Sequence, residues 1–127
     1  MCGNCCTGPP GFVHFTDVEA GAMAHLLELE KSEFLDRYTH ATPAGRSLKE
    51  KRTTHGFDCV FLERSEGKAR CGIYQARPQQ CRTWPFWKSN LRTEKTWTAL
   101  RRTCPGVDQG QLHDPAYIKL TRDRLDI

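Results

Sequence analysis

The sequence predicts a small, loop-rich α+β domain, and three observations lead to this fold class. The chain has 127 residues, which suits a single domain spanning residues 1–127. Helical and strand-like patterns alternate along it, which predicts two or three helices and a few short strands. Only 38% of the residues are hydrophobic, while seven are cysteines. Because thin cores are commonly reinforced by metals or disulfides, and seven thiols cannot all pair, we expect the domain to be organised around a cysteine-ligated metal site.

Two helices are expected in the N-terminal part, after a loop over residues 1–15. Thr16 is a candidate N-cap and is followed three residues later by Glu19, the spacing of a capping box. This helix is expected to run to about Glu30. Its apolar face is expected to consist of the residues that recur at helical spacing, Val18, Ala22, Leu26 and Leu29. A second short helix is expected over 32–39, with an apolar face of Phe34, Leu35 and Tyr38.

The middle of the chain predicts a hairpin. Residues 46–57 are polar and basic, and they suit either a loop or an edge strand. Residues 59–62 have the composition of a strand, residues 65–67 that of a turn, and residues 69–74 that of a return strand. The segment 59–74 is therefore expected to form a hairpin.

The C-terminal part predicts short helical segments joined by turns. Residues 76–81 suit a short helical turn, whereas Pro85 excludes a regular helix over 84–87. Residues 93–102 suit either a helix or a strand, and the CPG sequence at 104–106 suits a turn. Asp114 followed by Pro115 is typical of a helix start, so a last helix is expected to run to about Leu125.

Charge is distributed unevenly along the sequence. Residues 1–45 carry two basic and six acidic side chains, whereas residues 46–127 carry 17 basic and nine acidic ones. The basic part permits a protein or nucleic-acid partner, although its scattered Lys and Arg residues favour a solvated surface. Trp84, Phe86 and Trp87 suit stacking on bases or, as the favoured interpretation, a small apolar core that shields the metal site.

The expected compartment is the cytoplasm. The N-terminal residues have neither the basic nor the apolar region of a signal peptide, and no apolar run approaches the ~20 residues that span a bilayer. We therefore expect no membrane association. Because disulfides are rare in a reducing compartment, the cysteines are expected to serve metal or redox chemistry.

The cysteines carry the strongest functional signal. Cys2, Cys5 and Cys6 form a C-x2-C-C cluster, in which the C-x2-C spacing lets two thiolates bind one metal ion from a tight turn. The later cysteines stand singly and can complete the coordination once the chain folds; they are Cys59, Cys71, Cys81 and Cys104. Thiolates suit zinc, cuprous copper and iron–sulfur clusters. His14 and His55 are the first candidates for an additional ligand.

Three further residues are expected beside the metal. Arg77 and Arg82 suit charge compensation of a multi-thiolate site, or anion capture, as well as an ordinary surface turn. Tyr74 is expected to pack over the site and not to perform acid–base chemistry. No catalytic residue is assigned, because the sequence contains no nucleophile elbow, P-loop or dinucleotide-binding glycine pattern.

Three blocks of the sequence, in order, resemble one known family. The N-terminal CGNCC, the segment CGIYQARPQQCRTWPF and the later CPG together resemble the YkgJ-type CxxCxxCC family of zinc- or iron-chelating domains. The resemblance covers residues 2–106. It implies that the seven cysteines bind zinc or iron, as ions or as an iron–sulfur cluster, and that Tyr74, Arg77 and Arg82 belong to the surrounding motif. The family pattern has one further cysteine, three residues before the position of Cys2, that this sequence lacks.

The favoured hypothesis is a metal-binding domain whose metal holds the fold together. A metalloenzyme or redox protein using the same cysteines, acting on protein or RNA, is the alternative, and an open coordination position would distinguish it. Relatives in the resembled family include a flagellin lysine methylase, but this sequence has no evident binding site for a methyl donor. A nucleic-acid-binding zinc module is the third hypothesis, and it rests on the basic, Arg/Trp-rich stretch 82–102.

Overall fold

The computed structural model describes residues 2–127, and the chain divides into two compact units, residues 1–81 and 82–127. Helices and short antiparallel strands occur together, which confirms the α+β class. Five α-helices and six strands are present among the described residues, so the expectation of two or three helices was too low. The expected single domain over residues 1–127 stays a prediction.

Helix α1 (Asp17–Leu26) begins with the expected capping box. The Thr16 hydroxyl accepts a hydrogen bond from the Glu19 amide at 3.2 Å, and the Glu19 carboxylate accepts one from the Thr16 amide at 2.8 Å. The helix ends at Leu26, four residues before the predicted end. Glu28 has a φ of 56°, a left-handed conformation that cannot continue a right-handed helix.

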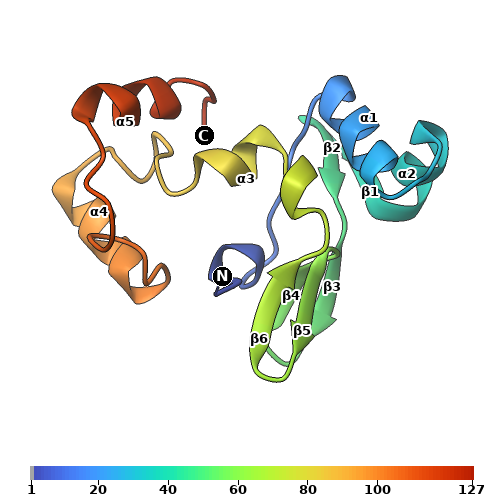
Figure 1. Ribbon diagram of the computed structural model, residues 1–127, viewed down its shortest axis with the longest axis horizontal. Coiled ribbons are helices and arrows are strands. Elements are labelled where there is room, and N and C mark those ends of the chain that lie inside the picture. The colour runs from blue at the N-terminus through green and yellow to red at the C-terminus, as the bar shows by residue number, and fades with distance from the viewer. Residues whose placement is uncertain (1) are drawn as a thin grey trace. The chain divides into compact units, whose positions relative to one another are not determined.

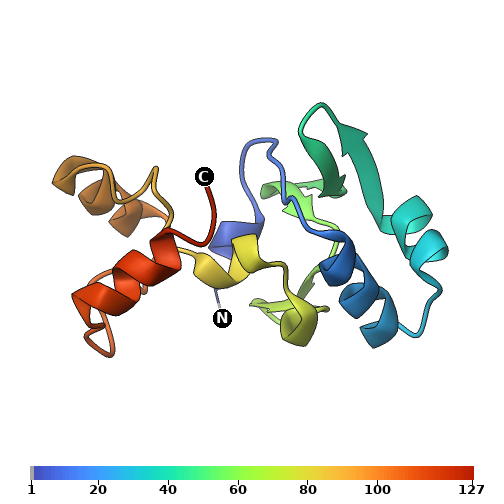
Figure 2. The ribbon, with the colours of Figure 1, turned by 90° about the horizontal axis from the view of Figure 1, so that it is seen from above.

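The buried face of α1 differs from the predicted one. Its fully buried residues are Ala20, Met23 and Ala24, whereas Val18 is 83% exposed. Helix α1 packs against α2 (Lys31–Tyr38), and the side that carries the alanines and Met23 enters the core cluster, so the predicted face points outward. Figure 2 shows α1 and α2 side by side. The second helix matches its prediction, because Phe34 lies fully buried on its inner face.

All six strands belong to two-stranded antiparallel sheets, and they form three successive hairpins (Figure 1). The hairpins are β1 (Thr39–Thr42) with β2 (Gly45–Leu48), β3 (Glu50–Thr53) with β4 (Gly56–Cys59), and β5 (Leu62–Ser65) with β6 (Lys68–Cys71). No sheet among the described residues has a third strand. Because an isolated two-stranded hairpin is marginally stable in water, the hairpins depend on what packs against them.

Two predictions for this region need correction. The segment 46–57, predicted as a loop or an edge strand, forms parts of two hairpins. The hairpin predicted over 59–74 exists, but its strands are β5 and β6, and Cys59 ends the preceding hairpin. Glu66 and Gly67 both have positive φ, which is the two-residue turn that matches the twist of paired strands and fixes this register.

The hydrophobic core of the first unit lies between the helices and the hairpins. Phe34 stacks on Phe61 with ring centroids 6.3 Å apart and contacts the ring of Tyr38. The remaining buried members are Ala20, Met23, Ala24, Leu48 and Ile73. Cys59 and Cys71 pack against the edge of this cluster. The core therefore positions the ends of two cysteine-bearing strands.

Helix α3 (Gln79–Thr83) follows a 3₁₀ turn at Tyr74–Ala76 and crosses the boundary between the units. The second unit contains α4 (Glu94–Ala99), continued by a 3₁₀ turn at Leu100–Arg102, and α5 (Pro115–Arg122). The open assignment of 93–102 is thus resolved as helix. Asp114 caps α5 as predicted, because its carboxylate accepts a hydrogen bond from the Ala116 amide at 2.7 Å. None of the described helices has the length and apolar character that crossing a membrane requires.

Candidate metal centre

The N-terminal cysteines lie on a tight turn. Residues Asn4–Cys6 form a single 3₁₀ turn, closed by a hydrogen bond from the Cys6 amide to the Gly3 carbonyl at 2.9 Å. The Sγ atoms of Cys5 and Cys6 are 3.7 Å apart. The hydrogen bond that they share lowers the pKa of Cys5 to about 6 and raises that of Cys6, so one proton serves both sulfurs.

Contacts on both sides hold this turn against the hairpins. On one side, buried Gly3 lies directly against Ala69 of β6 and Leu62 of β5. On the other, the Gly8 carbonyl accepts a hydrogen bond from the Phe57 amide of β4 at 2.8 Å. The N-terminal thiols are therefore positioned by the two hairpins whose strands end in Cys59 and Cys71.

A buried carboxylate links the N-terminal turn to the hairpins by a third route. The side chain of Asp58 is 1% exposed and accepts hydrogen bonds from Arg64 Nε at 2.9 Å and from the Thr7 hydroxyl. The hydrogen bond from Arg64, and then that from Thr7, lower the pKa of Asp58 to about 2. Since Thr7 follows Cys6 and Asp58 precedes Cys59, this network fixes the two cysteines relative to each other.

We expect Asp58→Asn to destabilise the chain by about 2 kcal/mol, because it removes the charge from hydrogen bonds that are worth roughly 1.5–3 kcal/mol each when ionised. The matched control is Glu63→Gln, which removes the charge of an exposed pair with Arg70 on the neighbouring hairpin. That change should cost less than about 1 kcal/mol. Urea denaturation of the metal-loaded proteins measures both. Equal effects of the two substitutions would argue against the linking role of Asp58.

Gly3 and Gly67 provide a matched test of the packed turn. Their φ angles are 73° and 72°, so Ala at either position carries the same backbone strain, roughly 1–2 kcal/mol. A Cβ at Gly3 would lie 2.6 Å from the Ala69 Cβ, whereas a Cβ at Gly67 has nothing within 4 Å. We expect Gly3→Ala to displace the turn and weaken metal binding at least tenfold. Loss of a residue that supports metal ligands typically lowers the affinity by about 10–100-fold. Gly67→Ala should bind metal like the parent chain in chelator competition.

The two hairpin cysteines have the same local geometry. Cys59 ends β4 and Cys71 ends β6, and each sulfur accepts a hydrogen bond from the backbone N–H two residues later, that of Phe61 and that of Ile73. Burial raises the pKa of Cys59 to about 11 and raises that of Cys71, while these N–H donors act in the opposite direction. Because Phe61 and Ile73 are anchored in the core, the donors are fixed in place.

Cys81 on α3 brings the number of neighbouring thiols to five. Burial, followed by negative charge on Cys59, Cys5 and Cys71, raises its pKa to about 12. The pKa of Cys6 is likewise raised by charge on Cys59 and Cys81, beyond the effects of Cys5 and burial. Thiols from the N-terminal turn, from two strand ends and from α3 thus lie within electrostatic range of one another.

Cations near these sulfurs favour their ionised forms. Charge on Arg77 lowers the pKa values of Cys5, Cys71 and Cys81, although burial outweighs this effect at the last two. The Arg77 guanidinium lies 3.7 Å from the centroid of the Tyr74 ring, and its Nε donates to the Tyr74 carbonyl at 3.0 Å. Tyr74 therefore holds the arginine in position, and half of the Tyr74 side chain remains exposed.

The remaining candidate residues are two cysteines, Arg82 and two histidines. Cys2 is exposed, and Cys104 and Arg82 belong to the second unit. The imidazole of His14 is engaged with Thr42 at 3.1 Å, and His55 lies in the β3–β4 turn, where its Nδ1 is 3.4 Å from the Thr54 hydroxyl. These positions give neither histidine a contact with a cysteine.

The chemistry of the donor set fits a thiophilic metal. All seven cysteines are free thiols, so none is consumed by a disulfide. Within residues 2–127, no group of three or more Cys, His, Asp or Glu side chains is arranged so that it could hold a metal ion. The five thiols thus influence one another electrostatically without being arranged as a coordination shell. Sulfur donors with basic neighbours suit zinc or iron and not calcium or magnesium.

A family model described as "Putative zinc- or iron-chelating domain" matches residues 1–105, a span that includes all seven cysteines. The chain belongs to the CxxCxxCC family. This finding confirms the resemblance that the three sequence blocks indicated. No solved structure matches the chain.

Several residues that shape this CxxCxxCC domain were missed by the sequence interpretation. Asp58 and Thr7 are 51 residues apart, and no local pattern predicts their contact. The N–H donors to Cys59 and Cys71 did have a signal: each cysteine ends a strand-like run and is followed two residues later by a large apolar residue. Lys51 and Arg64 also interact electrostatically with the thiols, since charge on Lys51 lowers the pKa of Cys59 and charge on Cys6 raises that of Arg64.

Proposed function

We propose that this CxxCxxCC domain binds zinc or iron through cysteine thiolates and that the metal holds the N-terminal unit together. The inner ligand set consists of Cys5, Cys6, Cys59, Cys71 and Cys81, with Cys2 and Cys104 as outer members. The observation that carries the proposal is the gathering of five free thiols from four separate segments. Basic neighbours at Cys5, Cys71 and Cys81 and N–H donors at Cys59 and Cys71 favour thiolates over inert thiols.

A structural role fits the architecture. The three hairpins do not join into one sheet, and the segments that carry the thiols lie up to 76 residues apart in the sequence, from Cys5 to Cys81. A metal held by these segments would tie the N-terminal turn, β4, β6 and α3 together, and such binding energy is folding energy. Arg77, Arg64 and Lys51 would balance the negative charge of the thiolates.

The test is the metal and acid-labile sulfide content per chain after purification without oxygen and without chelators, together with a visible absorption spectrum. Iron with sulfide and a brown colour identifies an iron–sulfur cluster, and colourless protein with zinc identifies a structural zinc site. Protein with seven reduced thiols and no bound zinc or iron would contradict the proposal.

A further inference from the structure

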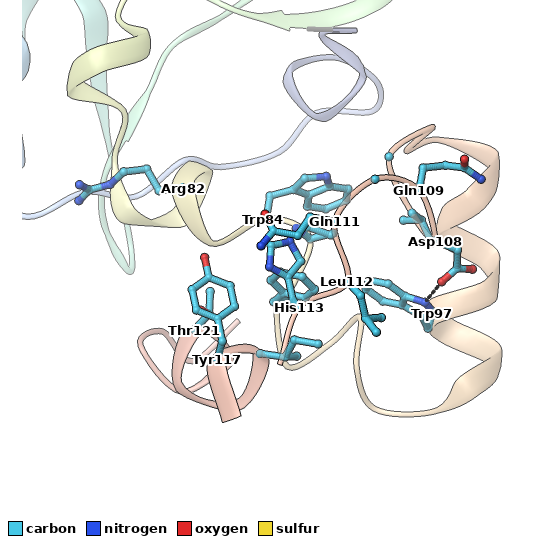
Figure 3. Close-up of a pocket in the computed structure, with 16 residues that line it drawn as sticks. Arg82, Trp84, Trp97, Asp108, Gln109, Gln111, Leu112, His113, Tyr117 and Thr121 are labelled. Carbon is cyan, nitrogen blue, oxygen red and sulfur yellow. Dashed lines mark hydrogen bonds between the residues drawn. The ribbon is translucent and has the colours of Figure 1, made fainter. Parts of the chain in front are cut away.

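The second unit contains a pocket that the metal centre does not use. Its volume is about 590 Å³, which lies within the range of roughly 300–1,000 Å³ typical of small-molecule sites. Every residue that lines it falls between Arg82 and Thr121, within this unit. Figure 3 shows its walls, which come from the segment after α3, from α4, from the loop before α5 and from α5 itself.

Aromatic rings form much of the pocket wall. Phe86 stacks on Trp97 with an interplanar angle of 8°, and His113 stacks on Tyr117 with ring centroids 5.1 Å apart. The His113 and Tyr117 rings meet Phe86 edge-on, so the two stacks join. The side chain of Tyr117 is 49% exposed, which leaves ring surface open to a flat ligand.

Polar groups of the pocket suit the edge of a heteroaromatic ring. Asp108 is the one carboxylate among the described lining residues, and it accepts hydrogen bonds from Trp97 Nε1 at 3.1 Å and from Arg101 Nε at 2.7 Å. Its negative charge is therefore balanced locally. Gln109 and Gln111 also line the pocket, and of the two the Gln111 side chain lies beside His113 in Figure 3; its amide can both donate and accept a hydrogen bond.

The charge of the second unit favours an anionic ligand. Residues 82–127 carry nine basic and five acidic side chains, whereas residues 1–81 carry ten of each. The whole net charge of +4 thus resides in the unit that contains the pocket, and so do all three tryptophans. Basic charge combined with exposed aromatic surface is the pattern by which proteins bind single-stranded nucleic acids and nucleotides.

We propose that this pocket binds a purine or pyrimidine base that carries a phosphate. The base stacks on the aromatic wall at Tyr117, the Gln111 amide meets its polar edge, and the net positive charge of the unit attracts the phosphate. The same chemistry is supplied by a free nucleotide and by a base within a single strand. The proposal does not depend on the five inner thiols, because every residue of the pocket lies in the second unit.

The experiment titrates the full metal-loaded chain with AMP, UMP, short oligoadenylate and short oligouridylate, and follows tryptophan fluorescence. Trp84 and Trp97 line the pocket, so saturable quenching that weakens with added salt is expected. Binding of AMP or UMP as tight as that of the strands identifies a free nucleotide as the ligand. Binding of the strands at least about tenfold tighter identifies a single-stranded nucleic acid. Absence of saturable binding by all four probes at low salt would overturn the proposal.

Substitutions at Tyr117 test the location. Tyr117→Leu removes the ring and should weaken binding about tenfold, the usual loss for one stacked base. Tyr117→Phe keeps the ring and should bind like the parent chain. Leu120→Ala, at a 69% exposed position of the same helix that does not line the pocket, is the matched control.

Undiminished binding by Tyr117→Leu would overturn the assignment. A second measurement covers the case in which that variant fails to fold. In the parent chain, nucleotide addition should shift the NMR signals of the Gln111 side-chain amide and the His113 ring. Shifts confined to other residues would equally overturn it.

Discussion

Removal of the metal by a strong chelator under reducing conditions is expected to unfold residues 1–81. Without metal, this unit is held together mainly by a core of seven buried residues, and its strands form only three separate two-stranded hairpins. Such hairpins are marginally stable alone. Structural zinc contributes on the order of 10–16 kcal/mol in small domains, which is comparable to the ~5–15 kcal/mol stability of an ordinary domain. The expected loss is therefore large enough to abolish the folded state of this unit.

Hydrogen exchange followed by mass spectrometry measures this effect segment by segment. Amides around Met23, Phe34 and Phe61, which are buried in the core, should lose their protection when the metal leaves. Helix α5 is the internal control, because the tryptophans and the aromatic cluster around it belong to the other unit. Retention of core protection in protein shown by analysis to be metal-free would refute a structural role for the metal.

The parts of the fold that the sequence predicted well depend on neighbouring residues. The capping box of Thr16 and Glu19 and the Asp114–Pro115 start of α5 are local interactions, and both occur as expected. The buried face of α1 is decided by contact with α2, and no periodicity within α1 alone reveals it. Likewise β2 and β3 are short and mostly polar. The pairing of β2 with β1 and of β3 with β4 depends on turns that contain Gly45 and Gly56, whose φ angles are 124° and 120°.

The candidate site, too, was predictable only where local sequence was sufficient. Thiols can be recognised by residue type, so the sequence could nominate all seven cysteines without knowing the fold. Which of them lie together depends on the end points of β4 and β6 and on the packing of Gly3 against Ala69, and these are tertiary contacts. The burial of Asp58 depends on partners six and 51 residues away, which single-sequence patterns do not connect.

The seven cysteines are expected to differ in how much metal binding they support. Cys59 and Cys81 have pKa values raised by burial to about 11 and about 12, so without metal they stay protonated at neutral pH. These thiols would lose their protons only on binding a metal, and the fold holds them in position as ligands. Cys2 is exposed and Cys104 lies in the other unit, and neither is held among the other thiols by a described contact.

We therefore expect Cys59→Ser and Cys81→Ser each to weaken metal binding more than about a hundredfold, beyond the 10–100-fold that loss of a supporting residue costs. Cys2→Ser and Cys104→Ser, which make the same chemical change outside the inner set, should weaken it less than tenfold. Chelator competition gives the affinities, and elemental analysis gives the stoichiometry. Equal losses at all seven positions would mean that every thiol belongs to one coordination shell. The distinction between inner and outer ligands would then be wrong.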